Sequence, residues 1–209
     1  MSFAVVGRRV AGFTCLDDKL YVVHKSSHRI HVLMADTLSE VSVITVDGLQ
    51  DPTDIVACRD DHQLYVIEWG RSTSDVGSSI WRVSAANPSD CEKWFTDDAI
   101  KAFCTLSLTS RRLLVTLQWC DSLRQYSTTN RQLLRVIEFP HSTKRLTHAA
   151  ETTRGTFVVV WQAAPSVVRE LFSFFRFSAF LHPWLGFDDL QFGFNKLQGW
   201  SLLGCYCGV

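Results

Sequence analysis

Several basic and aromatic side chains lie close together in the third quarter of this 209-residue sequence. Basic residues outnumber acidic ones over 101–154, whereas acidic residues are in excess over 1–100. Arginine binds phosphate groups and aromatic rings stack on nucleobases, so such side chains on one face could hold single-stranded RNA. The candidates for contacting RNA or a protein partner are Arg111, Arg112, Trp119, Arg124, Tyr126 and Arg154. Alternatively, these arginines lie in solvated turns and protect exposed strand ends.

A second group of side chains has the chemistry of metal ligands. Carboxylate and imidazole groups bind divalent cations when several of them converge on one point. The candidates are Asp54, Glu68, His148 and Glu151, which could equally serve as turn caps and strand-end residues. The sequence contains no glycine-rich phosphate loop, no Gly-X-Ser-X-Gly and no His-Glu-X-X-His. We therefore expect no enzymatic activity, no cofactor and no stoichiometric metal.

The cysteines indicate a reducing environment. Their number is odd and their spacing lacks the regularity of a disulfide framework. They are Cys15, Cys58, Cys91, Cys104, Cys120, Cys205 and Cys207. Arg8 and Arg9 near the N-terminus are not followed by a long apolar segment, so no secretory signal is evident. We expect a cytoplasmic protein.

These candidate residues lie in a repeated pattern of short strands. Apolar runs at 20–24, 64–68, 113–117 and 157–161 recur with a period of about 44 to 49 residues, which is typical of one four-stranded propeller blade. Turn-forming residues such as Asp17, Asp18, Asp47 and Gly48 separate the strands. The sequence predicts an all-β chain, a partial β-propeller of four-stranded antiparallel blades. Its buried positions should include Leu20, Val22, Leu64, Val66, Leu113, Val115 and Val158.

The run His28-Arg29-Ile30 resembles the signature of the NHL repeat, and the run 51–57 resembles the opening of such a repeat. The resemblance covers about residues 7–162. It implies a domain related to six-bladed β-propellers, which binds a protein partner through its rim loops without catalysis. Some such propellers bind single-stranded RNA on a basic face, which is the alternative function, and a metal-dependent propeller hydrolase is a distant third. His28 and Arg29 are expected to stabilise the blade rather than contact a ligand.

The repeats end before a ring is complete. Six copies would need roughly 260 residues at this period, whereas three copies and the front half of a fourth are present. Such an arc leaves an open blade face at each end unless the tail or a second chain covers it. The hydrophobic tail, 163–209, is rich in phenylalanine, and a helix beginning near Pro165 and ending before Pro183 is one interpretation. The apolar stretch 171–187 is interrupted by Arg176 and His182, so we expect no membrane span.

Overall fold

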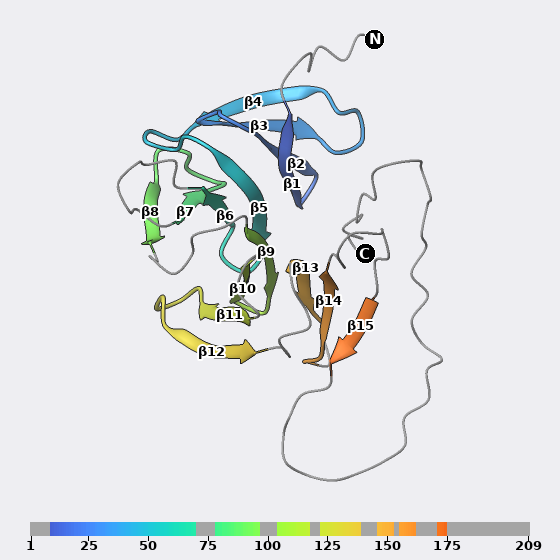
Figure 1. The fold of residues 1–209 in the computed structure, drawn as a ribbon. Coiled ribbons are helices and arrows are strands. Elements are labelled where there is room, and N and C mark those ends of the chain that lie inside the picture. Colours follow the sequence, from blue (N-terminus) through green and yellow to red (C-terminus); the bar gives the residue numbers. More distant parts are fainter. Residues whose placement is uncertain are drawn as a thin grey trace. The chain divides into compact units, whose positions relative to one another are not determined.

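The computed structural model describes residues 9–69, 78–96, 104–117, 122–138, 146–152, 155–161 and 171–174. In these ranges the chain forms strands, turns and no helix (Figure 1). The strands are β1 (Val10–Leu16), β2 (Lys19–His24), β3 (Arg29–Met34), β4 (Glu40–Thr45), β5 (Pro52–Cys58), β6 (Gln63–Glu68), β7 (Ser79–Ser84), β8 (Cys91–Thr96), β9 (Cys104–Thr109), β10 (Arg112–Leu117), β11 (Ser122–Ser127), β12 (Leu133–Glu138), β13 (Leu146–Glu151), β14 (Phe157–Trp161) and β15 (Leu171–Phe174). In the part of the chain that is described, no helix is long and apolar enough to cross a membrane.

The strands form four antiparallel sheets in which each strand pairs with the next one in sequence. Blade 1 contains β1 to β4, blade 2 β5 to β8, blade 3 β9 to β12 and blade 4 β13 to β15. The first strands of successive blades, β1, β5, β9 and β13, pack side by side as the inner strands (Figure 1). The described chain is therefore a partial β-propeller, as the repeats predicted.

Each blade presents two apolar faces because its middle strands are apolar at consecutive positions. We call the face toward the next blade the forward face and the other the rear face. On β2, Tyr21 and Val23 belong to the forward face, which packs on Leu64 and Val66 from the rear face of blade 2. Blades 2 and 3 form a second such layer, and blades 3 and 4 a third. The three layers between the blades are the core.

Most of the predicted buried positions are buried, and the two exceptions lie on the open ends of the arc. Leu64, Val66, Leu113 and Val115 are 0% exposed, and Val22 is 8% exposed. Leu20 on the rear face of blade 1 and Val158 on the forward face of blade 4 are both partly exposed. Their exposure follows from position rather than from a wrong strand register, because the described residues include no further blade at either face.

The helix expected after Pro165 is wrong at residues 171–174, where the structure has β15. β15 pairs with β14 in register Val159 to Phe172, so strand pairing continues beyond 162. Alternating phenylalanines suit a strand because they place large side chains on one face of a sheet. The remainder of the expected helix, and the tail 175–209, lie outside the described residues.

The inner strands approach one another closely, and Gly12 of β1 allows this. A Cβ atom at Gly12 would lie 2.7 Å from Oδ1 and 2.9 Å from Cα of Asp54 on β5. Both distances are shorter than the van der Waals contact distance of a Cβ atom. One of the two atoms belongs to the Asp54 backbone, which cannot move away as a flexible side chain could. Glycine is required here by contact with the neighbouring blade rather than by its backbone conformation.

We expect Leu113→Ala to lower the free energy of unfolding by about 2–5 kcal/mol, because it removes a fully buried side chain from the layer between blades 2 and 3. The control is Val136→Ala, since Val136 is an apolar residue of the same blade that is 46% exposed. This control should change stability by less than about 0.5 kcal/mol. Urea unfolding followed by tryptophan fluorescence measures both, and equal effects would contradict the assigned layer.

Candidate functional site

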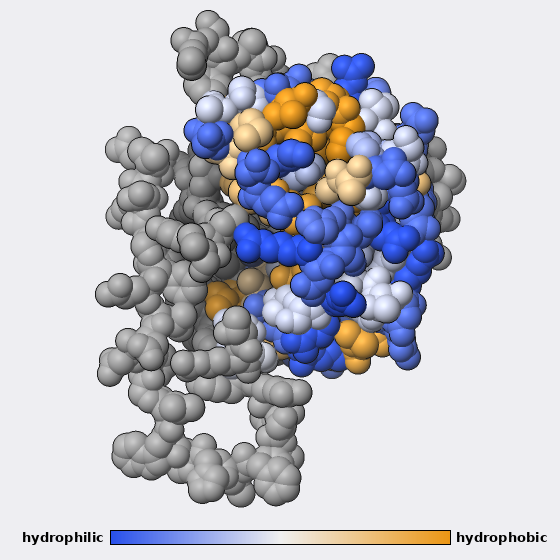
Figure 2. Space-filling model, turned by 180° about the vertical axis from the view of Figure 1, so that it is seen from behind, coloured by the Kyte–Doolittle hydropathy of each residue, from blue (hydrophilic) through white to orange (hydrophobic). Residues whose placement is uncertain are grey.

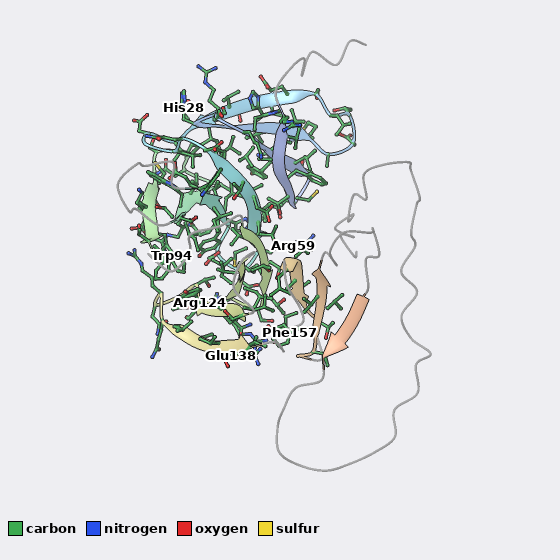
Figure 3. All side chains as sticks on the ribbon, in the orientation of Figure 1. His28, Arg59, Trp94, Arg124, Glu138 and Phe157 are labelled. Carbon is green, nitrogen blue, oxygen red and sulfur yellow. The ribbon has the colours of Figure 1, made fainter. Side chains whose placement is uncertain are left out.

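One rim of the propeller is formed by turns that the structure describes almost completely. Because consecutive strands are antiparallel, the turns after the first and third strands of each blade lie at the same rim. We call this the first rim. It contains the turns at 17–18, 35–39, 59–62, 85–90, 110–111, 128–132 and 152–156. The opposite, second rim includes 25–28 and 46–51, and Figure 3 labels Arg59 on the first rim and His28 on the second.

Backbone hydrogen bonds join the two first-rim turns within each of the first three blades. The amide of Ala35 donates to the carbonyl of Asp18 at 2.8 Å. The same bond recurs at 2.9 Å from Ala85 to His62 and from Thr128 to Arg111. A repeated bond of this kind fixes the turns, so that their side chains extend from a rigid frame.

Aspartate is the commonest charged residue among the exposed side chains of the first rim, which also include Arg59, Arg111 and Arg131. The exposed acidic residues are Asp17, Asp18, Asp36, Asp60 and Asp90. Two ion pairs connect neighbouring blades: Asp17 Oδ2 to His62 Nδ1 at 3.6 Å, and Asp60 Oδ2 to Arg111 Nε at 3.5 Å. Both pairs are more than half exposed, so each contributes little stability. This acidic rim is the charged surface that the structure describes most fully.

The predicted basic groove is divided between the two faces of one sheet. Arg112 is cross-strand from Ser127, and its side chain reaches Glu151 of blade 4, so it lies on the forward face. Arg124 pairs with Val115, whose side chain lies in the layer shared with blade 2, which places Arg124 on the rear face. Arg124 lies within β11 rather than in a turn, contrary to expectation. Only Arg111 of the described candidates lies in a rim turn.

The aromatic candidates do not provide a stacking surface in the described structure. Tyr126 is 2% exposed, and its ring lies 4.8 Å from that of Phe95. A buried ring cannot stack on a base. Trp119 and Arg154 lie outside the described residues, so their predicted roles remain predictions.

Glu151 is the centre of a polar network between blades 3 and 4 that sequence reasoning missed. Its side chain is 1% exposed. Oε1 accepts a hydrogen bond from Arg135 Nη2 at 2.9 Å and lies 3.4 Å from Arg112 Nη2, while Oε2 accepts one from Gln125 Nε2 at 2.7 Å. Arg135 Nε also donates to Gln125 Oε1 at 2.7 Å, and its guanidinium lies over the ring of Phe157. Opposite charges and donors thus satisfy a buried carboxylate.

A second carboxylate, Glu92, binds two further arginines. Arg131 Nη2 donates to both Glu92 oxygens, at 2.8 and 2.9 Å, and Arg82 Nη2 lies 2.7 Å from Oε1. Arg82 and Glu92 belong to blade 2, whereas Arg131 belongs to blade 3. Four described arginines from the basic region therefore lie beside carboxylates: Arg111, Arg112, Arg131 and Arg135.

The four candidate metal ligands are distributed over different blades and rims. Glu68 ends β6 at the second rim, where Oε2 accepts from Trp81 Nε1 at 2.8 Å and Oε1 from the Gln50 amide. Glu151 ends β13 at the first rim. Asp54 and His148 lie on the inner strands of blades 2 and 4, with blade 3 between them. No cluster of three metal-ligating side chains occurs among the described residues.

Asp54 is the most perturbed carboxyl group described. Its Oδ2 accepts a hydrogen bond from the Leu106 amide of β9 at 2.8 Å, and its Oδ1 accepts one from the Ile55 amide at 2.9 Å. Burial raises its pKa to about 7, while these two hydrogen bonds act in the opposite direction. The Asp54 carboxyl group connects β5 to β9, and each of its two oxygens accepts a hydrogen bond from a backbone amide. This is a structural role.

Burial favours the neutral forms of three titratable side chains, Cys58, Tyr65 and His148. Burial, with the nearby Asp61, raises the pKa of the Cys58 thiol to about 11, so it is not an activated nucleophile. Burial raises the pKa of Tyr65 and lowers that of His148. Cys58 and Cys91 are free thiols. Cys58 is buried on the inner strand of blade 2.

The NHL-like run has the expected local placement. Ile30 is 0% exposed and packs in the layer between blades 1 and 2, whereas His28 and Arg29 are exposed. The carbonyl of His28 accepts a hydrogen bond from the Val46 amide at 2.9 Å. The run therefore shapes a second-rim turn of blade 1.

Comparison with solved structures supports the propeller fold. The chain is similar to hydrazine synthase of Kuenenia stuttgartiensis, with 16% identity, a TM-score of 0.58, and 83% of this chain and 49% of that chain covered. It is also similar to the β-propeller domain of Myceliophteria thermophila Cps50 (Swd1), with 11% identity, a TM-score of 0.52 and 74% and 51% covered. The computationally designed Ika4 protein matches at 12% identity and a TM-score of 0.52, with 82% and 94% covered.

These similarities concern the fold alone, because the identities are low. The chain spans about half the length of the first two structures. No family model and no curated protein sequence matches the chain. The resemblance to NHL repeats is thus supported as far as the β-propeller architecture.

We expect Glu151→Gln to lower the free energy of unfolding by about 1.5–3 kcal/mol, because it weakens the charge-assisted contacts that the partly exposed Arg112 and Arg135 make to a buried carboxylate. Glu92→Gln is the matched control, since it also removes a carboxylate that binds two arginines but lies at the surface. It should cost about 1 kcal/mol or less. Chemical unfolding of both variants measures the difference, and equal costs would contradict the buried network.

The Asp54 carboxyl should make stability depend on pH. Its pKa is about 7 in the folded state against an ordinary value of 3.8 for an aspartate, so the folded protein binds more protons between these values. Stability contributed by this group is therefore present at low pH and is lost as pH rises toward 7. Comparing unfolding of the wild type and Asp54→Asn from pH 4.5 to 8 isolates the effect. The wild type should lose stability relative to the variant with rising pH, and parallel profiles would contradict the assignment.

Proposed function

We propose that this chain is a non-catalytic binding module that engages a protein partner through the turns of the first rim. The observation that carries the proposal is the set of exposed aspartates on those turns, Asp17, Asp18, Asp36, Asp60 and Asp90. Hydrogen bonds between paired turns hold them on a rigid frame. A partner segment rich in lysine or arginine would complement this surface, because opposite potentials favour association.

The alternative of RNA binding has less support. Four of the five described arginines of the basic region lie beside Asp60, Glu92 or Glu151, which neutralise them. Arg112 and Arg124 belong to opposite faces of one sheet, so a single strand could not follow both. The acidic rim would also repel a phosphate backbone. A metal-dependent hydrolase has less support still, because two of the four candidate ligands lie in blade 2 and two in blade 4, with blade 3 between them.

The proposal predicts that a short lysine-rich peptide binds the protein and that the double variant Asp18→Asn/Asp36→Asn weakens this binding about 5- to 10-fold. Fluorescence anisotropy with a labelled peptide at two salt concentrations measures the affinity. Asp47→Asn/Glu138→Gln is the control, because it removes the same charge from exposed residues of the second rim.

Binding should weaken with added salt and should be unchanged in the control variant. Equal losses in both variants would indicate attraction by net charge rather than by the first rim. Tight binding of labelled oligouridine, with weak binding of the peptide, would overturn the proposal in favour of RNA.

A further inference from the structure

The rear face of blade 1 repeats a pattern that the other blades bury. Counting along the second strand of each blade gives two equivalent rear-face positions. The first is occupied by Leu20, Leu64, Leu113 and Phe157, and the second by Val22, Val66, Val115 and Val159. In blades 2 to 4 these side chains are between 0% and 4% exposed, because each packs on the preceding blade. In blade 1 Leu20 is partly exposed and Val22 is 8% exposed.

Apolar side chains of this face reach from β1 to the outermost strand of blade 1, where they lie beside a polar contact between His31 Nδ1 and Glu40 Oε2 at 2.7 Å. Phe13 and Val22 are cross-strand neighbours, Val22 pairs with His31, and His31 pairs with Val43. Leu20 pairs with Leu33 on the same face. Val43 on the outermost strand is 39% exposed. Figure 2 shows hydrophobic side chains at the surface over blade 1, at the top of the view.

The forward face of blade 4 is its counterpart at the other end of the arc. Val158 occupies the position that Tyr21, Tyr65 and Leu114 occupy in blades 1 to 3. Those three are at most 3% exposed because the next blade covers them, whereas Val158 and its neighbour Ala150 are partly exposed. Within the described residues, β13 is not packed against β1, so the arc does not close on itself.

We propose that the rear face of blade 1 docks on the forward face of blade 4 of a second copy of this chain. In that contact Leu20 and Val22 would meet Val158 as Leu64 and Val66 meet Tyr21 within one copy. The dimer contains this contact twice. Leu20 of the first copy meets Val158 of the second, and Leu20 of the second copy meets Val158 of the first, which is the reciprocal pattern of a two-fold dimer. Each copy then covers both open faces of the other.

Two observations favour a second copy over other occupants. The chain spans about half the length of the Swd1 propeller domain, so two arcs supply a ring's worth of blades. Closed propellers have about four to eight blades, a range that includes two arcs of four. In contrast, the sequence after residue 174 lacks the repeated strand pairs separated by turn residues that mark the four blades.

The test is the mass of the intact protein in solution, by light scattering after gel filtration and by sedimentation. The monomer mass is 23.7 kDa, and we expect twice that value for the wild type. Leu20→Glu and Val158→Glu should each give monomers, because each places a charge in both contacts. Val136→Glu is the control, since it introduces the same charge at a residue that is 46% exposed and lies away from either end of the arc.

Mixing the two variants distinguishes a lost contact from a lost fold. In a dimer of one Leu20→Glu copy and one Val158→Glu copy, both substituted residues meet in the same contact, and the other contact has the wild-type residues. The mixture should therefore form dimers that neither variant forms alone. Circular dichroism of each variant checks that the strands remain. A monomeric wild type would overturn the proposal. A dimer that survives both single substitutions, or variants that stay monomeric when mixed, would overturn it as well.

Discussion

The whole structure depends on burying both faces of each sheet. A four-stranded meander with apolar residues at consecutive positions of its middle strands has apolar side chains on both faces. Such a sheet is stabilised by packing against neighbouring blades. The layers between blades 1 and 2, 2 and 3, and 3 and 4 meet this requirement. Close contact at the inner strands follows from it, with Gly12 against Asp54 and the Asp54 carboxyl hydrogen-bonded to β9. The polar interactions align blades that the apolar layers already hold together.

Most of the described ion pairs join neighbouring blades. The basic excess over 101–154 favoured a basic binding surface in that segment. The folded chain instead brings arginines of blade 3 to carboxylates of blades 2 and 4, at Asp60, Glu92 and Glu151. Segments of opposite charge thus neutralise each other across the blade boundaries. Aspartate is the commonest charged residue that remains exposed on the first rim.

The strands could be predicted from the sequence because their signals are local. Turn residues such as Asp17 and Asp18 mark the ends of alternating or continuous apolar runs, and those runs agree with the observed strands to within about two residues. β15 was missed because phenylalanines without turn residues around them also fit a helix. The opposite faces of Arg112 and Arg124 could have been found by counting positions along the predicted hairpin. The Glu151 network could not have been predicted in this way. It depends on contacts between side chains of separate sheets, and local sequence patterns do not indicate such contacts.

The meander within each blade has a consequence for synthesis on the ribosome. Every strand pairs with the next strand in the sequence. The strands of a blade can therefore pair as soon as that blade has been synthesised. Hairpins form in about 1–10 μs, whereas a ribosome adds only about 5–20 residues per second. Blade 1 therefore waits for seconds beside the exit tunnel before β5 and β6 arrive to cover its forward face. During that interval Tyr21, Val23, Ile30 and Val32 are accessible to chaperones and to other nascent chains, as is the forward face of each later blade before its successor is made.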